Sequence, residues 1–204
     1  MTVPPHPIPL DDGLWLWTGM ADDAQRRKIL RQHLAGLAGC APEQLRLERD
    51  PLGRPYIVAP APDLHFSQAR RGDVLVVAAR RGGLVGVDVE SLRHEEGRDL
   101  SWVDAVAGDF FAAGEARWLR SLPDAERADG FFRLWTAKEA VLKALGRGIA
   151  QGMRQPELSS LLTPGQPLNA TPCRLEAHEC VFKVCWWDWR QGQVRLCRAL
   201  LDEE

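Results

Sequence analysis

The chain repeats one coarse order of strands and helices in its two halves. In the first half, a strand pattern at 14–19 is followed by a helical pattern at 22–39 and then by further strands. In the second half, a strand pattern at 84–92 is followed by helical patterns and then by alternating strands. Strands and helices that mix in this way, with hairpins between neighbouring strands, predict an α+β fold. We therefore expect two similar α/β halves, residues 1–83 and residues 84–204.

Local signals add detail to this outline. The first dozen residues are rich in proline and predict a loose lead-in. Residues 101–122 carry one continuous helical pattern that Pro123 ends. A second and longer helix is predicted over 126–145, with Gly146 as its stop signal.

The last fifty residues predict a loop and then strands. Residues 155–172 are rich in proline, serine and glycine, which is typical of a loop. Residues 173–201 alternate between apolar and polar side chains on both sides of Gln191 and Gly192. This pattern predicts a β-hairpin that turns at those two residues.

Composition excludes several classes of protein. The formal charge of −2, from 26 basic and 28 acidic residues, argues against a dedicated nucleic-acid-binding protein. The longest apolar run, 74–79, is too short to cross a membrane, and the N-terminus lacks the basic and apolar regions of a secretory signal. The five cysteines form no Cys-x-x-Cys pair, which is typical of reduced thiols, so we expect a cytoplasmic protein.

Asp88 and Glu90 are the first candidates for chemistry. They lie two residues apart in a predicted strand, so both carboxylates project from the same face. Two adjacent carboxylates repel each other unless a cation lies between them. Oxygen ligands of this kind suit Mg²⁺, which shares its other coordination positions with water and substrate phosphates. A solvated acidic strand end would have the same pattern, and the pair alone does not separate the two interpretations.

Glu139 and Lys143 are the second candidates. They lie one helical turn apart, so their side chains are adjacent. One interpretation is an ordinary surface ion pair. In the other, Glu139 is a third carboxylate near Asp88 and Glu90, and Lys143 holds a phosphate or accepts a proton.

Basic residues gather in three further places. They lie on the predicted helix at 22–39, in the turn that contains Arg54, and at Arg70 and Arg71. Basic helix faces and loops are usually solvated. The same residues would also suit a polyanionic small ligand, because guanidinium groups make paired hydrogen bonds with phosphate.

Four short segments together carry a family resemblance. Residues 85–90 are VGVDVE, and residues 135–143 are WTAKEAVLK. This pair resembles the two signature motifs of the Sfp-type 4'-phosphopantetheinyl transferases. Between them, Phe110-Phe111 with Glu115 is similar to the family's F-F-x-x-x-E motif. Residues 52–55, LGRP, are similar to its G-K-P turn, with arginine in place of lysine.

The resemblance implies a fold and a reaction. The fold is two α+β halves related by a pseudo-twofold axis, and the protein is expected to be a monomer. The reaction moves 4'-phosphopantetheine from coenzyme A to a serine of an acyl or peptidyl carrier protein and releases adenosine 3',5'-bisphosphate. Such carrier proteins serve fatty acid, polyketide or nonribosomal peptide biosynthesis.

The resemblance also implies roles for acidic residues and lysines. By matching position, Asp88, Glu90 and Glu139 would bind Mg²⁺ at the pyrophosphate of coenzyme A. Lys143 and Lys138 would contact the phosphates, and either Glu139 or Lys143 would help to deprotonate the incoming serine. Attack on a pyrophosphate depends on charge neutralisation and in-line positioning, which these residue types can supply.

The remaining contacts with coenzyme A include one departure from the family. Arg26, Arg31 and Arg54 would hold phosphates of coenzyme A. Ser67 matches the family's F-N-x-S-H-S segment, but Gln68 stands where the family has a histidine that contacts the phosphates. Gln68 can donate a hydrogen bond but carries no charge. This departure favours an alternative function, a non-catalytic module that binds coenzyme A or a carrier protein.

Overall fold

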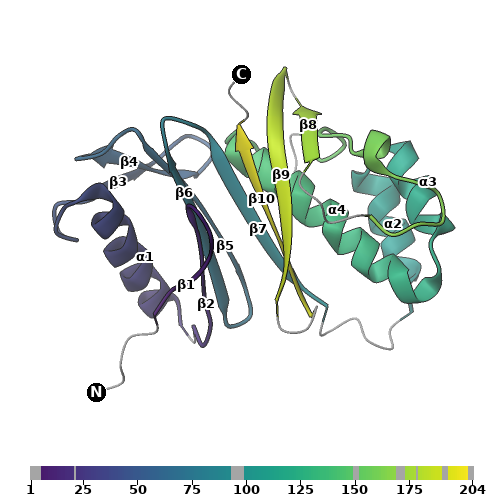
Figure 1. Ribbon diagram of the computed structural model, residues 1–204, viewed down its shortest axis with the longest axis horizontal. Helices are drawn as coiled ribbons and strands as arrows, with labels where there is room; N and C mark the ends of the chain where they lie inside the picture. The colour runs from purple at the N-terminus through teal and green to yellow at the C-terminus, as the bar shows by residue number, and fades with distance from the viewer. Residues whose placement is uncertain are drawn as a thin grey trace.

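Two four-stranded antiparallel sheets form the centre of the computed structural model, which describes residues 6–20, 22–92, 99–148, 152–168, 173–177, 179–189 and 193–201 (Figure 1). The first sheet contains β1 (Ile8–Asp11), β2 (Leu14–Trp17), β6 (Val74–Arg81) and β5 (Leu64–Arg71), in that order. The second contains β7 (Val85–Ser91), β10 (Val194–Leu201), β9 (Cys180–Trp189) and β8 (Cys173–Ala177), in that order. A separate hairpin contains β3 (Arg46–Arg49) and β4 (Pro55–Ala59). The helices are α1 (Asp23–Ala38), α2 (Ser101–Phe110), α3 (Ala113–Ser121), α4 (Asp124–Ala144) and the 3₁₀ turn η2 (Ser159–Leu161).

The sheets and helices are arranged in layers. Helix α1 lies on the outer side of the first sheet, and α2, α3 and α4 lie on the outer side of the second (Figure 1). Between the sheets, buried side chains of β2, β5 and β6 pack against buried side chains of β7 and β10. The edge strands β5 and β7 also approach each other, because the Ser67 hydroxyl accepts a hydrogen bond from the Val87 amide at 3.1 Å. The predicted mixture of strands and helices is confirmed.

The predicted first and longest helices are also confirmed, and their ends have local causes. The Asp22 carboxylate accepts a hydrogen bond from the Gln25 amide at 2.7 Å and caps α1. Gly39 ends α1 in the left-handed region, with φ of 70°. Gly146 has the same φ after α4, where side chains other than glycine are strained.

Two predictions about local structure were wrong. The proline-rich lead-in contains β1, which pairs with β2 across a turn at Asp12 and Gly13. Asp-Gly is a strong hairpin signal, which outweighs the prolines before it. The single helix expected at 101–122 is two helices, because the backbone is extended at Phe111 and Ala112. The buried Phe111 ring fills the core at this break, which a continuous helical pattern does not reveal.

The C-terminal tail forms three strands. β9 and β10 pair as the predicted hairpin, and β8 adds a third strand beside β9. The predicted turn at Gln191 and Gly192 lies outside the described residues. Within the ranges described, none of the helices is long and apolar enough to cross a membrane.

Candidate active site

Strand β7 lies directly against α4 because one of its residues has no side chain. A Cβ atom on Gly86 would lie 1.8 Å from the carbonyl oxygen of Ala140 and 2.6 Å from the amide nitrogen of Ala144. The glycine of the VGVDVE segment therefore allows the close approach of strand and helix. This approach brings the carboxylates of the strand to the side chains of the helix.

Asp88, Glu139 and Lys143 meet at this contact. The Lys143 ammonium lies 2.6 Å from Asp88 Oδ1 and 3.5 Å from Glu139 Oε2. Asp88 is only 6% exposed, and its neighbours Val87 and Val89 are buried as well. The surface ion pair that the sequence left open for Glu139 and Lys143 is thus part of a mostly buried cluster between β7 and α4.

Glu90 lies at the more open end of the cluster. Its Oε2 is 3.0 Å from Arg71 Nε, at the end of β5. Burial raises the pKa of the Glu90 carboxyl, and Arg71 offsets part of this effect. The two acidic side chains of β7 therefore pair with different basic side chains: Asp88 pairs with Lys143, and Glu90 pairs with Arg71.

The cluster holds acidic groups in an environment that disfavours their charge. Burial raises the pKa of Asp88 to about 7, and the nearby Glu139 and Glu90 carboxylates add to this shift. Burial also disfavours the Lys143 ammonium, but Asp88 and Glu139 outweigh it and hold the pKa of Lys143 above its usual value. Lys143 therefore carries a positive charge beside the two carboxylates.

The chemistry of these side chains fits a divalent cation. They are oxygen donors, and Asp88 Oδ2 is buried without a hydrogen-bond partner among the described residues. An additional cation there would relieve the buried charge of Asp88. In the present arrangement, no three acidic, histidine or cysteine side chains of the described ranges stand close enough to share one ion. Lys143 pairs with Asp88 and Glu139 instead, while Arg71 pairs with Glu90.

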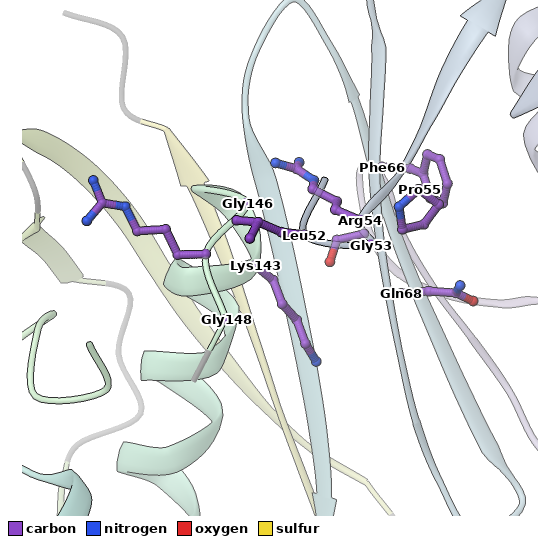
Figure 2. A pocket seen from close by; sticks show the side chains of 11 residues that line it. Leu52, Gly53, Arg54, Pro55, Phe66, Gln68, Lys143, Gly146 and Gly148 are labelled. Atoms are coloured by element: carbon purple, nitrogen blue, oxygen red, sulfur yellow. The ribbon is translucent and has the colours of Figure 1, made fainter. Parts of the chain in front are cut away.

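A cavity of about 310 Å³, here called the turn cavity, opens beside the cluster (Figure 2). Residues 52–54 of the turn before β4 and Pro55, the first residue of β4, form one wall, and Gly146 to Gly148, which follow α4, form another. Arg54 joins the two walls, because its Nη1 donates to the Ala144 carbonyl at 2.9 Å. The other lining residues are Phe66, Ser67, Gln68 and Lys143.

A second cavity of about 450 Å³, here called the arginine cavity, shares Gln68 and Lys143 with the turn cavity. Acidic residues of β7, Asp88 and Glu90, lie along it together with Asp23 of α1. The remaining charged lining residues are the arginines Arg26, Arg27, Arg49 and Arg70. The two cavities together connect basic side chains of the first sheet and α1 with the acidic cluster.

Most of the predicted site residues line these cavities, but three do not. Glu139 lies behind Lys143 in the acidic cluster, with its Oε2 3.5 Å from the Lys143 ammonium. Lys138 is fully buried, pairs with Glu115 at 2.9 Å and donates to the Pro156 carbonyl, so its side chain does not face the cavities. Arg31 donates to the Pro42 and Leu45 carbonyls, each at 2.6 Å, and holds the segment after α1. Lys138 and Arg31 therefore contact other parts of the protein in this structure, and their phosphate contacts stay predictions.

One arginine of the arginine cavity, Arg49, was absent from the sequence-based set. Arg49 ends β3, and the sequence had indicated only an alternating, half-buried strand there. The pairing of β3 with β4 brings Arg49 beside the turn, where its Nη1 donates to the Gly53 carbonyl. The alternation of charges at 46–49 is the signal that could have identified it.

Comparison with known proteins identifies relatives of this chain. The 4'-phosphopantetheinyl transferase HetI of Nostoc sp. is 35% identical over 143 residues, which cover 69% of this chain and 57% of the relative. The 4'-phosphopantetheinyl transferase psf-1 of Bacillus pumilus is 35% identical over 168 residues, 79% of this chain and 66% of the relative. A putative 4'-phosphopantetheinyl transferase of Synechocystis sp., slr0495, is 35% identical over 130 residues, which cover 63% of this chain and 51% of the relative.

The chain thus spans between one half and two thirds of the length of these three curated relatives. A family model described as the 4'-phosphopantetheinyl transferase superfamily matches residues 84–198. This range includes β7, the helices α2, α3 and α4, and β10 as far as Arg198. The matched region contains the whole acidic cluster. The chain therefore belongs to the 4'-phosphopantetheinyl transferase superfamily.

Proposed function

We propose that the protein transfers the 4'-phosphopantetheine group of coenzyme A to a serine hydroxyl of an apo acyl or peptidyl carrier protein. The observation that carries this proposal is the position of Lys143. Its ammonium lies 2.6 Å from Asp88, and its side chain lines both the turn cavity and the arginine cavity. A phosphate bound between the two cavities would meet Lys143, basic groups of the first half and the acidic cluster at one place.

The reaction requires one bond to form and one to break. The serine oxygen attacks the phosphorus that carries pantetheine, and the bond to the bridging oxygen breaks to release adenosine 3',5'-bisphosphate. Asp88, Glu90 and Glu139 would hold Mg²⁺, which would replace Lys143 and Arg71 as the partner of these carboxylates. When bound, Mg²⁺ would neutralise the charge of the pyrophosphate. On this proposal Lys143 and Arg54 bind phosphate oxygens, while Ser67 lines the turn cavity and Gln68 lines both cavities.

We propose Glu139 as the group that accepts the serine proton, directly or through a water molecule. Asp88 and Glu139 hold the pKa of Lys143 above its usual value, so Lys143 stays protonated at neutral pH and suits phosphate binding better than proton abstraction. Glu139 lies one turn before Lys143 on α4, and its Oε2 is 3.5 Å from the Lys143 ammonium, so on this proposal it would stand close to a phosphate that Lys143 binds.

The proposed function also concerns how the chain is organised and whether it acts as a monomer. We propose that residues 1–83 and 84–204 are two related halves with a pseudo-twofold axis, joined between β6 and β7. We also propose a cytoplasmic monomer whose site is made by one chain. Sedimentation of the purified protein with and without coenzyme A tests the monomer.

A transfer assay tests the function. The protein is incubated with coenzyme A, Mg²⁺ and apo acyl or peptidyl carrier proteins, and the carrier is weighed by mass spectrometry. We expect the carrier to gain the phosphopantetheine mass, and Glu139→Gln to slow this by about 100-fold or more. Arg81→Gln, on β6 and paired with Asp63, is the control that leaves the rate unchanged. Chelation of divalent ions should stop transfer, and added Mg²⁺ should restore it.

A non-catalytic module is the second candidate, and Gln68 is the observation that favours it. An uncharged side chain between the two cavities weakens the expected grip on phosphate. If the protein binds coenzyme A while no carrier gains mass, and Glu139→Gln behaves like the wild type, the module is the better description.

A further inference from the structure

The arginine cavity has a charge that differs from that of the whole chain. The protein carries −2 overall, yet five cationic side chains and three acidic ones line this cavity. Two of the acidic ones, Asp88 and Glu90, already face Lys143 and Arg71. The arginines are therefore in excess, and such a cavity selects an anionic ligand.

Gln68 and Arg70 occupy the same face of strand β5. They lie two residues apart in the strand, and both line the arginine cavity. Two residues of a strand span about 7 Å, which a fully extended arginine side chain can bridge. Figure 2 shows the Gln68 side chain extending away from Arg54 and Lys143. Gln68 is uncharged, and Arg70 is the next residue on the same face.

Asp23 orients the guanidinium of Arg70. Its carboxylate pairs with Arg70 and also with Arg26, whose Nη2 lies 2.9 Å from Oδ1. One carboxylate thus holds two guanidinium groups, which leaves a net positive charge at the rim of the cavity. Arg70 remains 58% exposed, so a dissolved ligand can reach it.

His65 does not supply this charge. It lies three residues before Gln68, so it faces the other side of β5. Its side chain lines a separate cavity of about 280 Å³ beside Tyr56 and Leu84.

From these observations we infer that Arg70 is a phosphate-binding residue for coenzyme A and supplies the positive charge that position 68 lacks. This inference rests on the proposed function. Its chemistry is that of a guanidinium paired with a phosphate group at the rim of the arginine cavity, beside Arg26. Asp23 acts as the positioning residue that holds Arg70 and Arg26 toward the ligand.

Calorimetric titration with coenzyme A tests the inference. Arg70→Gln should raise the Kd for coenzyme A about tenfold, whereas Arg70→Lys, which keeps the charge, should stay within about threefold of the wild type. Arg81→Gln is the matched control, because Arg81 is 52% exposed and pairs with Asp63 much as Arg70 pairs with Asp23. A Kd for Arg70→Gln within twofold of the wild type, or an equal loss in Arg81→Gln, would overturn the inference.

A second variant adds a readout that a structural role would not change. If positions 68 and 70 serve the same phosphate, Gln68→His should restore affinity to Arg70→Gln at pH 6, where an imidazole is largely charged, and much less at pH 8. Equal affinity of the double variant and Arg70→Gln at both pH values would refute the shared site. Failure of the proposed function looks different: the wild type then transfers nothing to any carrier, or does not bind coenzyme A at all.

Discussion

Replacing Glu115 by alanine would remove an acceptor from the middle of the second half. Glu115 and Lys138 are both fully buried and lie 2.9 Å apart. The Glu115 carboxylate also accepts the amides of Ala112 at 2.8 Å and Leu158 at 2.7 Å. The Lys138 ammonium donates to the Pro156 carbonyl as well. This pair therefore joins the start of α3, the middle of α4 and the segment before η2.

The two partners differ in what their removal leaves behind. Breaking a buried ion pair costs about 3–5 kcal/mol, because one charge stays buried without its partner. Glu115→Ala also leaves two amides without an acceptor, at about 1–3 kcal/mol each when they stay buried. Lys138→Met leaves Glu115 with both amide donors. Since these contributions overlap, we expect losses of about 5 kcal/mol for Glu115→Ala and about 3 kcal/mol for Lys138→Met.

Urea denaturation followed by tryptophan fluorescence measures both losses. Glu115→Gln keeps a carbonyl acceptor and should fall between the wild type and Glu115→Ala, which preserves the comparison if the alanine variant does not fold. Arg46→Ala removes an exposed charge and should change the free energy of unfolding by less than about 0.5 kcal/mol. Losses below 1 kcal/mol for both buried partners, or a larger loss for Lys138→Met than for Glu115→Ala, would refute the reasoning. Folded Lys138→Met should bind coenzyme A like the wild type, because Lys138 does not line the cavities.

Three further changes test the site. Gly86→Ala should destabilise the protein by about 3 kcal/mol in urea denaturation, since the new Cβ would clash with the Ala140 carbonyl, whereas Gly108→Ala, which has open space, should not. Burial raises the pKa of Asp88 from 3.8 to about 7, so the folded state binds the extra proton and this group's contribution to stability falls as pH rises through that window. We therefore compare the free energy of unfolding of Asp88→Asn with that of the wild type, both without metal. The difference should favour the variant more at pH 8 than at pH 5, and a difference that does not depend on pH would contradict this. Arg54→Gln should raise the KM for coenzyme A about tenfold with little change in kcat, because its guanidinium lies in the turn cavity rather than at the acidic cluster.

Elements with local signals were predictable from the sequence. Helix α1 begins after Asp22 and ends at Gly39 as expected, and Gly146 follows the end of α4. The break at Phe111 was not predictable in the same way, because Glu115 and the distant Leu158 stabilise it through contacts that form only in the folded chain. Strand β1 had a local signal, the Asp-Gly turn, and the prolines before it concealed the signal.

Helical geometry decides which of the predicted basic residues line the cavities and which do not, and a motif match does not take this geometry into account. Lys138 and Lys143 lie five residues apart on α4, and five residues of a helix rotate the side-chain direction by about 140°. Both lysines therefore cannot face one cavity, and the structure has Lys143 in the cavities and Lys138 in the core. Arg26 and Arg31 have the same spacing on α1, and only Arg26 lines the arginine cavity. A motif lists the residues that a family keeps, but it does not separate those that touch substrate from those that hold the helix in place.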